Sequence, residues 1–269
     1  MAQYNLIIIG TGNIAKGLIF ELLNISLHNH SVFINVYLYS QLEERVLGYL
    51  HDLQDALLMK EKLFNQKACI KFNNIKSIND SILIDCIVCC TGITLSHHTV
   101  KDRASLYPLH CNLINRMEFL KTINLHEDCK LINITNPVDE INGYLSSITK
   151  IPYKNIYGIG LSHDIARIIL ETGLMKIEAE GKHGEHLDIY LNKKKISIHD
   201  AAQKRGLNIL ALKGGNESPI FAPVTSLSFF LFALIFNYEI ITYASVWDEI
   251  NHDFIGKKII LKNREHIIL

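Results

Sequence analysis

Residues 4–24 constrain the fold of this chain more than any other stretch. The apolar run YNLIIIG is followed at once by TGN and then by IAKGLIFELLN, whose apolar residues recur at helical spacing. Gly10 permits a tight turn, and the small residue Ala15 lets the helix pack closely against the strand before it. The pattern predicts a buried strand, a tight turn, and a helix that opens directly from that turn.

The same turn is suited to a bound phosphate group. Gly12 lets the backbone approach a pyrophosphate, and the N-terminus of the helix offers N–H groups and the positive end of its dipole. We therefore predict a dinucleotide site, the alternative being a tight turn without a ligand. After the second strand the chain has Ser40 where an acidic residue usually binds the adenine ribose. Serine does not repel a 2′-phosphate, and Arg45 could meet one, so both NAD and NADP stay open.

The first half of the chain alternates apolar strands with amphipathic helices. Strands are expected at 4–10, 31–40, 68–74, 82–92 and 130–137, and helices at 13–24, 41–59 and 106–125. Strands that are apolar throughout and alternate with helices are typical of a parallel sheet covered on both faces. We predict an α/β fold with a Rossmann-type doubly wound parallel sheet, which forms a dinucleotide-binding domain over residues 1–140.

The pattern changes after about residue 140. Expected elements are a helix at 162–175, paired strands at 176–181 and 186–192, a strand then a helix within 193–215, and a hairpin at 257–269. This mixture predicts a smaller α+β substrate domain over residues 141–269. The apolar segment 221–236 has too short a continuous apolar run for a membrane span, so we expect a buried helix there.

Composition narrows the range of partners. The chain has 27 Lys plus Arg and 27 Asp plus Glu among its 269 residues, which does not favour binding to nucleic acid or to an acidic membrane surface. Its six cysteines lack the spacing of a disulfide framework, and strand alternation places Cys86 and Cys89 on opposite faces. We expect buried thiols in a reducing cytoplasm, no export signal, and a small-molecule partner.

Six segments of the chain together resemble the lactate/malate dehydrogenase superfamily. They are GTGNIAKGL, HDLQDA, CTGITLSHHTVKDRASL, NITNPVDEINGYL, GIGLSHDIAR and EGKHGEH, in the family's order and approximate spacing. The resemblance implies an NAD(P)-dependent oxidoreductase that transfers a hydride between a nicotinamide cofactor and a small 2-hydroxy or 2-oxo acid. It also implies a homodimer or homotetramer, with the helix in ERVLGYLHDLQDALLM at the subunit interface.

The resemblance also suggests roles for individual residues. His183 is expected to exchange a proton with the substrate oxygen, and Asp164 to hold the other nitrogen of its ring. Arg167, one helical turn from Asp164, is expected to bind the substrate carboxylate with a two-pronged contact. Arg103 resembles the family's loop arginine, which polarises the carbonyl oxygen. Asn136 resembles the asparagine that hydrogen-bonds near the reacting carbon and the nicotinamide.

The cofactor site implied by the resemblance is spread over three segments. The expected contacts are Gly10, Gly12, Asn13, Ile14, Ser40, Thr91, Gly92 and Asn136.

The segment TGITLSHHTVKDR departs from the family pattern. It has no arginine before Arg103, where malate-specific members have one, and it is a residue or two longer. Leu95 could instead face an apolar substrate tail, which favours a monocarboxylic 2-oxo acid over oxaloacetate.

Two alternatives stay open at this point. Ser40, the altered loop, and a chain that stops after the family's late hairpin are compatible with a catalytically weak or inactive nucleotide-binding protein on the same scaffold. A zinc site formed by His97, His98, His183 and His186 is the other alternative, but a metal there would block the substrate site. We therefore predict no metal.

Overall fold

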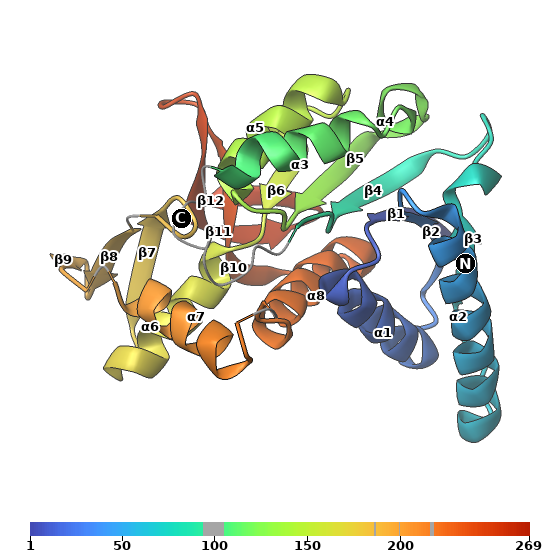
Figure 1. Ribbon diagram of the computed structural model, residues 1–269, viewed down its shortest axis with the longest axis horizontal. Helices are drawn as coiled ribbons and strands as arrows, with labels where there is room; N and C mark the ends of the chain where they lie inside the picture. Colours follow the sequence, from blue (N-terminus) through green and yellow to red (C-terminus); the bar gives the residue numbers. More distant parts are fainter. Residues whose placement is uncertain (94–104, 186, 199, 216–217) are drawn as a thin grey trace.

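A computed structural model describes residues 1–93, 105–185, 187–198, 200–215 and 218–269 of the chain. In this part of the chain the strands form one twelve-stranded sheet with helices on both faces (Figure 1). Six parallel strands lie in the order β3-β2-β1-β4-β5-β6. Their bounds are β1 Ala2–Ile9, β2 Val32–Tyr39, β3 Ile70–Asn74, β4 Ile84–Cys89, β5 Leu125–Asn133 and β6 Ile156–Gly158. This order is that of a doubly wound dinucleotide-binding sheet, and it confirms the predicted Rossmann-type architecture.

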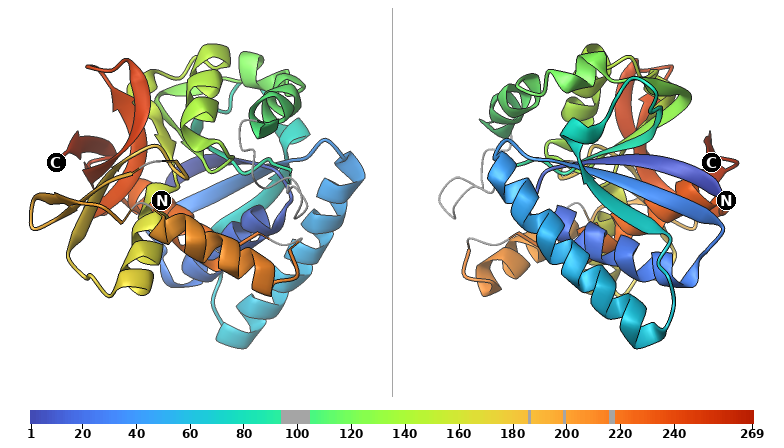
Figure 2. Two further views of the ribbon diagram at one scale, coloured as in Figure 1. Left: turned by 60° about the vertical axis from the view of Figure 1, so that its left-hand side comes forward. Right: turned by 90° about the vertical axis from the view of Figure 1, so that its right-hand side faces the viewer.

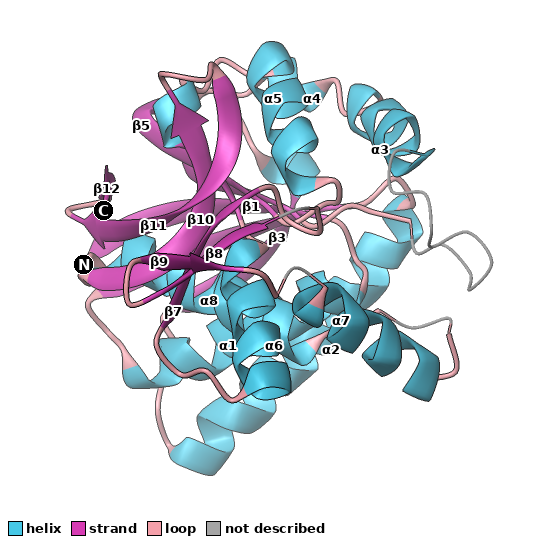
Figure 3. Ribbon diagram, turned by 90° about the vertical axis from the view of Figure 1, so that its left-hand side faces the viewer, coloured by secondary structure: helices cyan, strands magenta, loops and turns pink. Residues whose placement is uncertain are grey.

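Helices cover both faces of the parallel sheet, and each face has its own apolar core. One face packs against α1 (Asn13–His28), α2 (Glu43–Phe64) and α8 (Phe221–Phe236), and the other against α3 (Leu106–Asn115), α4 (Phe119–Thr122) and α5 (Val138–Ile148) (Figure 3). Cys86 lies in the first core and Cys89 in the second, as strand alternation predicts. All six cysteines are thiols without a disulfide.

The second half of the chain extends the sheet with antiparallel strands. Beyond β6 the order is β10-β11-β7-β8-β9, and β12 pairs with β11. The bounds are β7 Ile177–Gly181, β8 Leu187–Leu191, β9 Lys194–Ile196, β10 Ile240–Asp248, β11 Asp253–Lys262 and β12 Glu265–Ile268, with helices α6 Leu161–Thr172 and α7 Ala201–Leu212. The predicted hairpins at 176–192 and 257–269 are confirmed.

The boundary between residues 140 and 141 stays a prediction. Strand β6 continues the parallel sheet on the C-terminal side of that boundary, and α8 lies beside α1 (Figure 1). The two halves of the sequence therefore share one sheet and one core.

Several elements differ from the sequence expectation. The helix expected at 106–125 stops at Asn115 and is followed by the short α4, and β5 begins at Leu125, five residues before the expected strand. Two strands, β6 and β10, were not expected. They pair with each other through Ser245 and Gly158, and this pairing joins the parallel part of the sheet to the antiparallel part.

The apolar segment 221–236 forms the buried helix that its composition predicts. Nine of its side chains are buried, among them Leu227, Phe230 and Leu231, which lie in the core beside α1. Within the described residues no helix combines the length and the apolar character needed to cross a bilayer. Helix α2, by contrast, runs along the β3 edge of the sheet and buries only Val46 and Leu50 (Figure 2).

The contact between α1 and α8 generates a test of this packing. A methyl group added at Gly17 would lie 2.6 Å from Cγ2 of Val224, a buried, stiff side chain on α8. We expect Gly17→Ala to lower the free energy of unfolding by about 1–3 kcal/mol through overpacking, despite alanine's better helix propensity. Urea denaturation followed by circular dichroism measures this change.

Gly48 provides the matched control, because it lies in α2 with nothing within 4 Å of an added methyl group. Gly48→Ala is expected to raise the free energy of unfolding by about 0.5–1 kcal/mol. Equal gains for both variants would contradict the packing of α8 on α1.

Candidate active site

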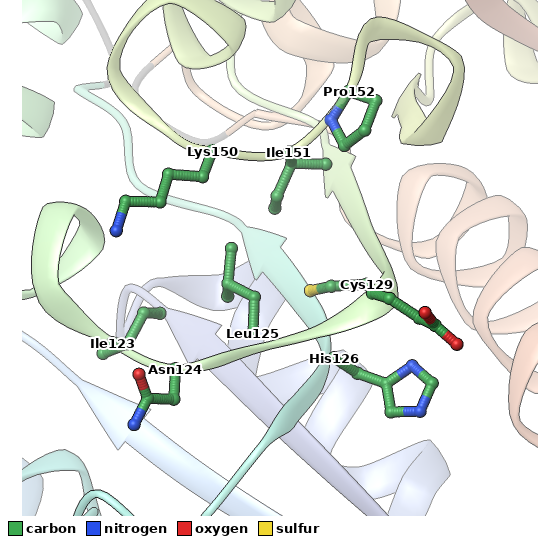
Figure 4. A pocket seen from close by; sticks show the side chains of 9 residues that line it. Ile123, Asn124, Leu125, His126, Cys129, Lys150, Ile151 and Pro152 are labelled. Carbon is green, nitrogen blue, oxygen red and sulfur yellow. The ribbon is translucent and has the colours of Figure 1, made fainter.

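A cavity of about 370 Å³ lies at the carboxyl ends of β1, β4, β5 and β6, where open α/β sheets bind their ligands. Its wall includes segments from both halves of the sequence, and α6, α7 and α8 complete it. A second cavity of about 340 Å³ lies at the opposite end of β5, around Leu125, Ile151 and Cys129 (Figure 4). The side chains of His183, Asp164 and Arg167, which are hydrogen-bonded to one another, line the first cavity. This cavity is therefore the candidate site.

The glycine turn adopts the geometry that the sequence predicts. Gly10 has a φ of +110°, and its N–H donates to the carbonyl oxygen of Tyr39 at 2.9 Å, which fixes the turn to the end of β2. Gly12 caps α1 without a side-chain hydrogen bond, and a methyl group added there would meet nothing within 4 Å. The first turn of α1 has no acidic residue, so it is open to a negatively charged group.

His183 and Asp164 form a hydrogen-bonded pair inside the cavity. Nδ1 of His183 lies 2.6 Å from Oδ2 of Asp164, and both side chains are about 95% buried. An ionised carboxylate can only accept, so Nδ1 carries the proton, and in the neutral ring Nε2 is the nitrogen free of a proton. Gly160 makes the approach possible, because a methyl group there would lie 2.3 Å from Cγ of the His183 ring.

Asp164 also binds Arg167, one turn later in α6. Nη1 of Arg167 donates to Oδ1 of Asp164 at 3.1 Å. Burial alone would raise the pKa of the Asp164 carboxyl, but His183, His163 and Arg167 together hold that pKa well below its usual range. Asp164 is therefore ionised at neutral pH, and it holds a ring nitrogen and a guanidinium at the same time.

The backbone of His183 has a separate anchor on α5. Its N–H donates to Oδ2 of Asp139 at 2.9 Å. Burial raises the pKa of Asp139 to about 6, although the Ser245 hydroxyl and the His183 N–H lower it in part. The next residue back along the chain, Lys182, bridges Glu140 and Asp253. Two carboxylates from two different helices thus fix the ring and the backbone of His183.

The structure brings most of the sequence-predicted residues together. The cavity wall contains Gly12, Asn13, Ile14, Thr91, Gly92, Asn136, Asp164, Arg167 and His183. Gly10 and Ser40 lie beside it, at the ends of β1 and β2, and Ser40 Oγ is 3.4 Å from both Thr11 Oγ1 and the N–H of Leu42. Arg103 and Leu95 lie outside the described residues, as do His97, His98 and His186 of the zinc alternative.

Two further residues of the site, His163 and Asp139, were not identified from the sequence, whereas His110 stands where the family resemblance leads one to expect an asparagine. His163 packs edge-on against His183, with ring centroids 4.9 Å apart, and Asp139 and His110 are buried beside the cavity. The helical spacing of His163 to Arg167, at i and i+4, is a signal that could have revealed it. The roles of Asp139 and His110 depend on contacts 44 and 26 residues away in sequence.

The geometry favours proton chemistry over a metal at this cluster. The ligand atoms of His163, Asp164 and His183 lie within 4.8 Å of one another, which would allow a metal ion. However, a tetrahedral metal with bonds of about 2.0–2.1 Å keeps its ligand atoms about 3.3 Å apart. The 2.6 Å contact between His183 and Asp164 is the length of a charge-assisted hydrogen bond.

The whole fold has close counterparts among solved structures. Malate dehydrogenase from Plasmodium falciparum superimposes with a TM-score of 0.73 and 18% sequence identity, over 99% of this chain and 90% of that one. Lactate dehydrogenase from Eimeria maxima, solved with NADH and oxamate, gives 0.74 and 18%, over 100% and 87%. Malate dehydrogenase from Cryptosporidium parvum gives 0.71 and 17%, over 99% and 91%.

The chain has the malate and lactate dehydrogenase fold. Its sequence matches no protein-family model and none of the curated proteins compared with it. The likeness to this dehydrogenase fold therefore rests on three-dimensional structure at low sequence identity. The shared fold extends over 99–100% of this chain.

The raised pKa of Asp139 predicts how stability depends on pH. A carboxyl whose pKa rises on folding opposes folding once it ionises, so its cost grows from about pH 4 upward and is complete above about pH 6. Asp139→Asn keeps an oxygen that can accept from the His183 N–H but cannot ionise. Between pH 4.5 and 7.5 we expect the free energy of unfolding of this variant to gain about 2 kcal/mol relative to the wild type.

Urea titrations at several pH values measure this difference. The neighbouring variant Glu140→Gln, which also removes one negative charge, is the control. Parallel pH profiles for the wild type and Asp139→Asn would mean that burial does not raise the pKa of Asp139.

Proposed function

We propose that this protein is a member of the lactate/malate dehydrogenase superfamily and an NAD(P)-dependent 2-hydroxy-acid dehydrogenase. The observation that carries the proposal is the pairing of His183 with Asp164 at 2.6 Å, with Arg167 bound to the same carboxylate. The three side chains line one cavity at the carboxyl edge of the parallel sheet, where His183 would serve as the proton acceptor and Arg167 as the cation that binds a carboxylate. The dehydrogenase fold makes the same chemistry the natural expectation.

The residues present fit a nicotinamide dinucleotide. The uncapped first turn of α1 and the open space beside Gly12 suit the pyrophosphate, with Asn13 and Ile14 next to it. Oδ1 of Asn136 is buried and has no hydrogen-bond partner among the described residues, so it is available to an amide donor such as a carboxamide. Thr91 and Gly92 complete this wall. When bound, the nicotinamide would accept or supply the hydride.

Cofactor preference depends on the end of β2. Ser40 offers a hydroxyl there, and Arg45 lies exposed at the start of α2. NAD is our first proposal, because the solved relative from Eimeria maxima contains NADH. NADP stays a proposal as well, because no carboxylate at position 40 would repel its 2′-phosphate.

The chain's own groups would handle the proton. Because Nδ1 of His183 is held by Asp164, Nε2 can take the proton of a substrate hydroxyl during oxidation and return it during reduction. The ionised Asp164 stabilises the imidazolium that forms and keeps the ring in one orientation. Asp139 holds the backbone of the same residue, so neither the ring nor its main chain has to reorganise as the proton moves.

Arg167 is proposed to bind the substrate carboxylate, and Arg103 to polarise the reacting oxygen. Apolar side chains from α7 and from the residue that precedes α8 line the same cavity, including Leu207, Leu210 and Ile220. We propose a monocarboxylic 2-oxo acid with an apolar side chain as the substrate, with Leu95 contributing to its tail site.

Assembly and compartment complete the proposal. Helix α2 exposes apolar side chains that a second copy of the chain could cover, among them Leu47, Leu58 and Met59. This exposure supports a homodimer or homotetramer in which α2 lies at the interface. The six thiols without disulfides fit the reducing cytoplasm.

The proposed function predicts turnover that depends on His183. Purified protein should change the absorbance of NADH or NADPH with at least one 2-oxo acid from a panel of pyruvate, oxaloacetate, and branched and aromatic acids. His183→Gln should lower kcat/KM by about 10²–10⁴-fold, because it removes the proton acceptor, while cofactor affinity stays within about threefold.

His126→Gln is the control, because this exposed histidine lies in the second cavity, at the far end of β5. If the wild type binds cofactor but turns over no 2-oxo acid, the protein is a nucleotide-binding protein without this activity, and the proposed reaction is wrong.

Arg167 generates a second kinetic prediction. Arg167→Lys keeps the positive charge but loses the planar two-pronged contact, so we expect the KM for the 2-oxo acid to rise and kcat/KM to fall by about 10–100-fold. Arg205→Lys is the matched control, since Arg205 pairs with Glu171 at 3.1 Å outside the cavity wall. Equal kinetics for the two variants would show that Arg167 does not bind the carboxylate.

A further inference from the structure

His110 joins two backbone segments of the cavity wall with the two nitrogens of one ring. The side chain extends from α3 and is 2% exposed. Its Nε2 lies 2.8 Å from the backbone nitrogen of Ile93, and its Nδ1 contacts the carbonyl oxygen of Asn136. Ile93 follows the end of β4 and Asn136 follows the end of β5, so the ring spans two adjacent strands of the sheet.

The two contacts determine the protonation of this ring. The backbone N–H of Ile93 can only donate, so Nε2 must be the acceptor and carry no proton. The carbonyl of Asn136 can only accept, so Nδ1 must carry the proton and donate. Burial lowers the pKa of His110, and the bond to the carbonyl offsets part of this effect. The ring is thus a neutral imidazole in the Nδ1–H form, and each nitrogen is used once.

The segments joined by His110 are those proposed to contact the nicotinamide. Thr91, Gly92 and Ile93 follow β4, Thr135 and Asn136 follow the adjacent strand β5, and all five residues line the cavity. Thr135 Oγ1 donates to the carbonyl oxygen of Thr91 at 2.5 Å, which makes a second link between the same segments. A methyl group added at Gly92 would lie 3.7 Å from Nε2 of His110, so the ring packs directly against this backbone.

The link matters because of the side chain of Asn136. Its Oδ1 is buried and has no hydrogen-bond partner among the described residues, whereas the carbonyl of the same residue is held by His110. Among the described contacts of Asn136, the hydrogen bond from His110 therefore holds its backbone, and we expect the orientation of its amide in the cavity to depend on this bond. A displacement of about 1 Å at such a contact is enough to cost about 10²-fold in rate.

We propose that His110 is a positioning residue, which holds Asn136 and the Thr91–Ile93 segment in the arrangement that receives the nicotinamide. The proposal rests on the proposed function, because it assigns the bound group to this wall. His110 does not touch the reacting atoms and acts through Asn136. A histidine that only fills space in the core would contribute to stability without any effect specific to kcat.

Three substitutions separate the two contacts of the ring. His110→Asn keeps a donor near the position of Nδ1, facing Asn136, whereas His110→Gln keeps an acceptor near the position of Nε2, facing Ile93. His110→Ala removes both. We expect kcat for 2-oxo acid reduction to fall tenfold or more in the alanine and glutamine variants and to stay within threefold of the wild type in the asparagine variant. The KM for the 2-oxo acid should change less than threefold in all three, because Arg167 is untouched.

His266→Ala is the matched control. His266 is half-buried, burial also lowers its pKa, and its Nδ1 lies 3.2 Å from the hydroxyl of Tyr157, away from the cavity wall. It should lose stability without a tenfold loss of kcat. If all three His110 variants keep the wild-type kcat, or lose it equally with a proportional loss of thermal stability, the positioning role is overturned.

Two measurements keep this test separate from the proposed reaction. The ¹⁵N spectrum of the imidazoles, compared between the wild type and His110→Gln, should show a neutral Nδ1–H ring for His110, and an Nε2–H or charged ring would overturn the proposal. A fluorescence titration with NADH or NADPH should show at least tenfold weaker binding by His110→Ala than by the wild type. If the wild type binds cofactor but shows no turnover, the proposed reaction is refuted. If His110→Ala then binds cofactor as tightly as the wild type, the positioning role is refuted as well.

Discussion

The bond between His183 and Asp164 depends on the convergence of three separate elements. Asp164 lies in the first turns of α6, His183 in the connection from β7 to β8, and Gly160 leaves the space in which the ring meets the backbone before α6. Asp139 adds the start of α5, through the N–H of His183. The convergence requires the antiparallel extension of the sheet, because β10 and β11 lie between β6 and β7 and determine where the hairpin that carries His183 can reach. The pairings of Gly158 with Ser245 and of Gly181 with Gly256 fix that reach.

Local sequence predicts the cofactor side of the molecule well, because its structure is determined by neighbours in the chain. The pattern of about 20 consecutive residues predicts the strand, the turn at Gly10 and the helix that begins at Asn13. All three are found at the predicted positions. Strand β6 could not be predicted in this way, because three residues carry no periodicity. The polar start of β5, from Leu125, also reads as part of a helix until its pairing with Ile84 of β4 is known.

The substrate side could be anticipated only through the resemblance of scattered motifs. Asp164 and His183 are 19 residues apart, and no spacing rule connects an acid in a helix to a histidine in a hairpin. Taken alone, the segment around His183, with glycines at 181 and 184, is typical of a polar turn. The burial of both side chains indicates a paired role instead, because a carboxylate and an imidazole that are shielded from solvent each need a hydrogen-bond partner. The same reasoning explains why Asp139 was missed, since its partner is a backbone group that the sequence does not distinguish.

The charges in the cavity also bear on the order of events in the proposed reaction. Asp164 is ionised and Arg167 is cationic, so the charges of these two described residues cancel each other. A bound 2-oxo acid would add one negative charge beside Arg167. In a site shielded from water that charge favours a positive imidazolium at His183, which is the form that must donate the proton during reduction. Binding of the acid would therefore favour protonation of His183, and protonation of His183 would favour binding of the acid.

Oxidation begins from the opposite state, since an unprotonated Nε2 is needed to accept the hydroxyl proton. With the bound acid and a neutral His183 the site carries one net negative charge, which favours transfer of the hydroxyl proton to Nε2, so the same residues serve both directions of the proposed reaction.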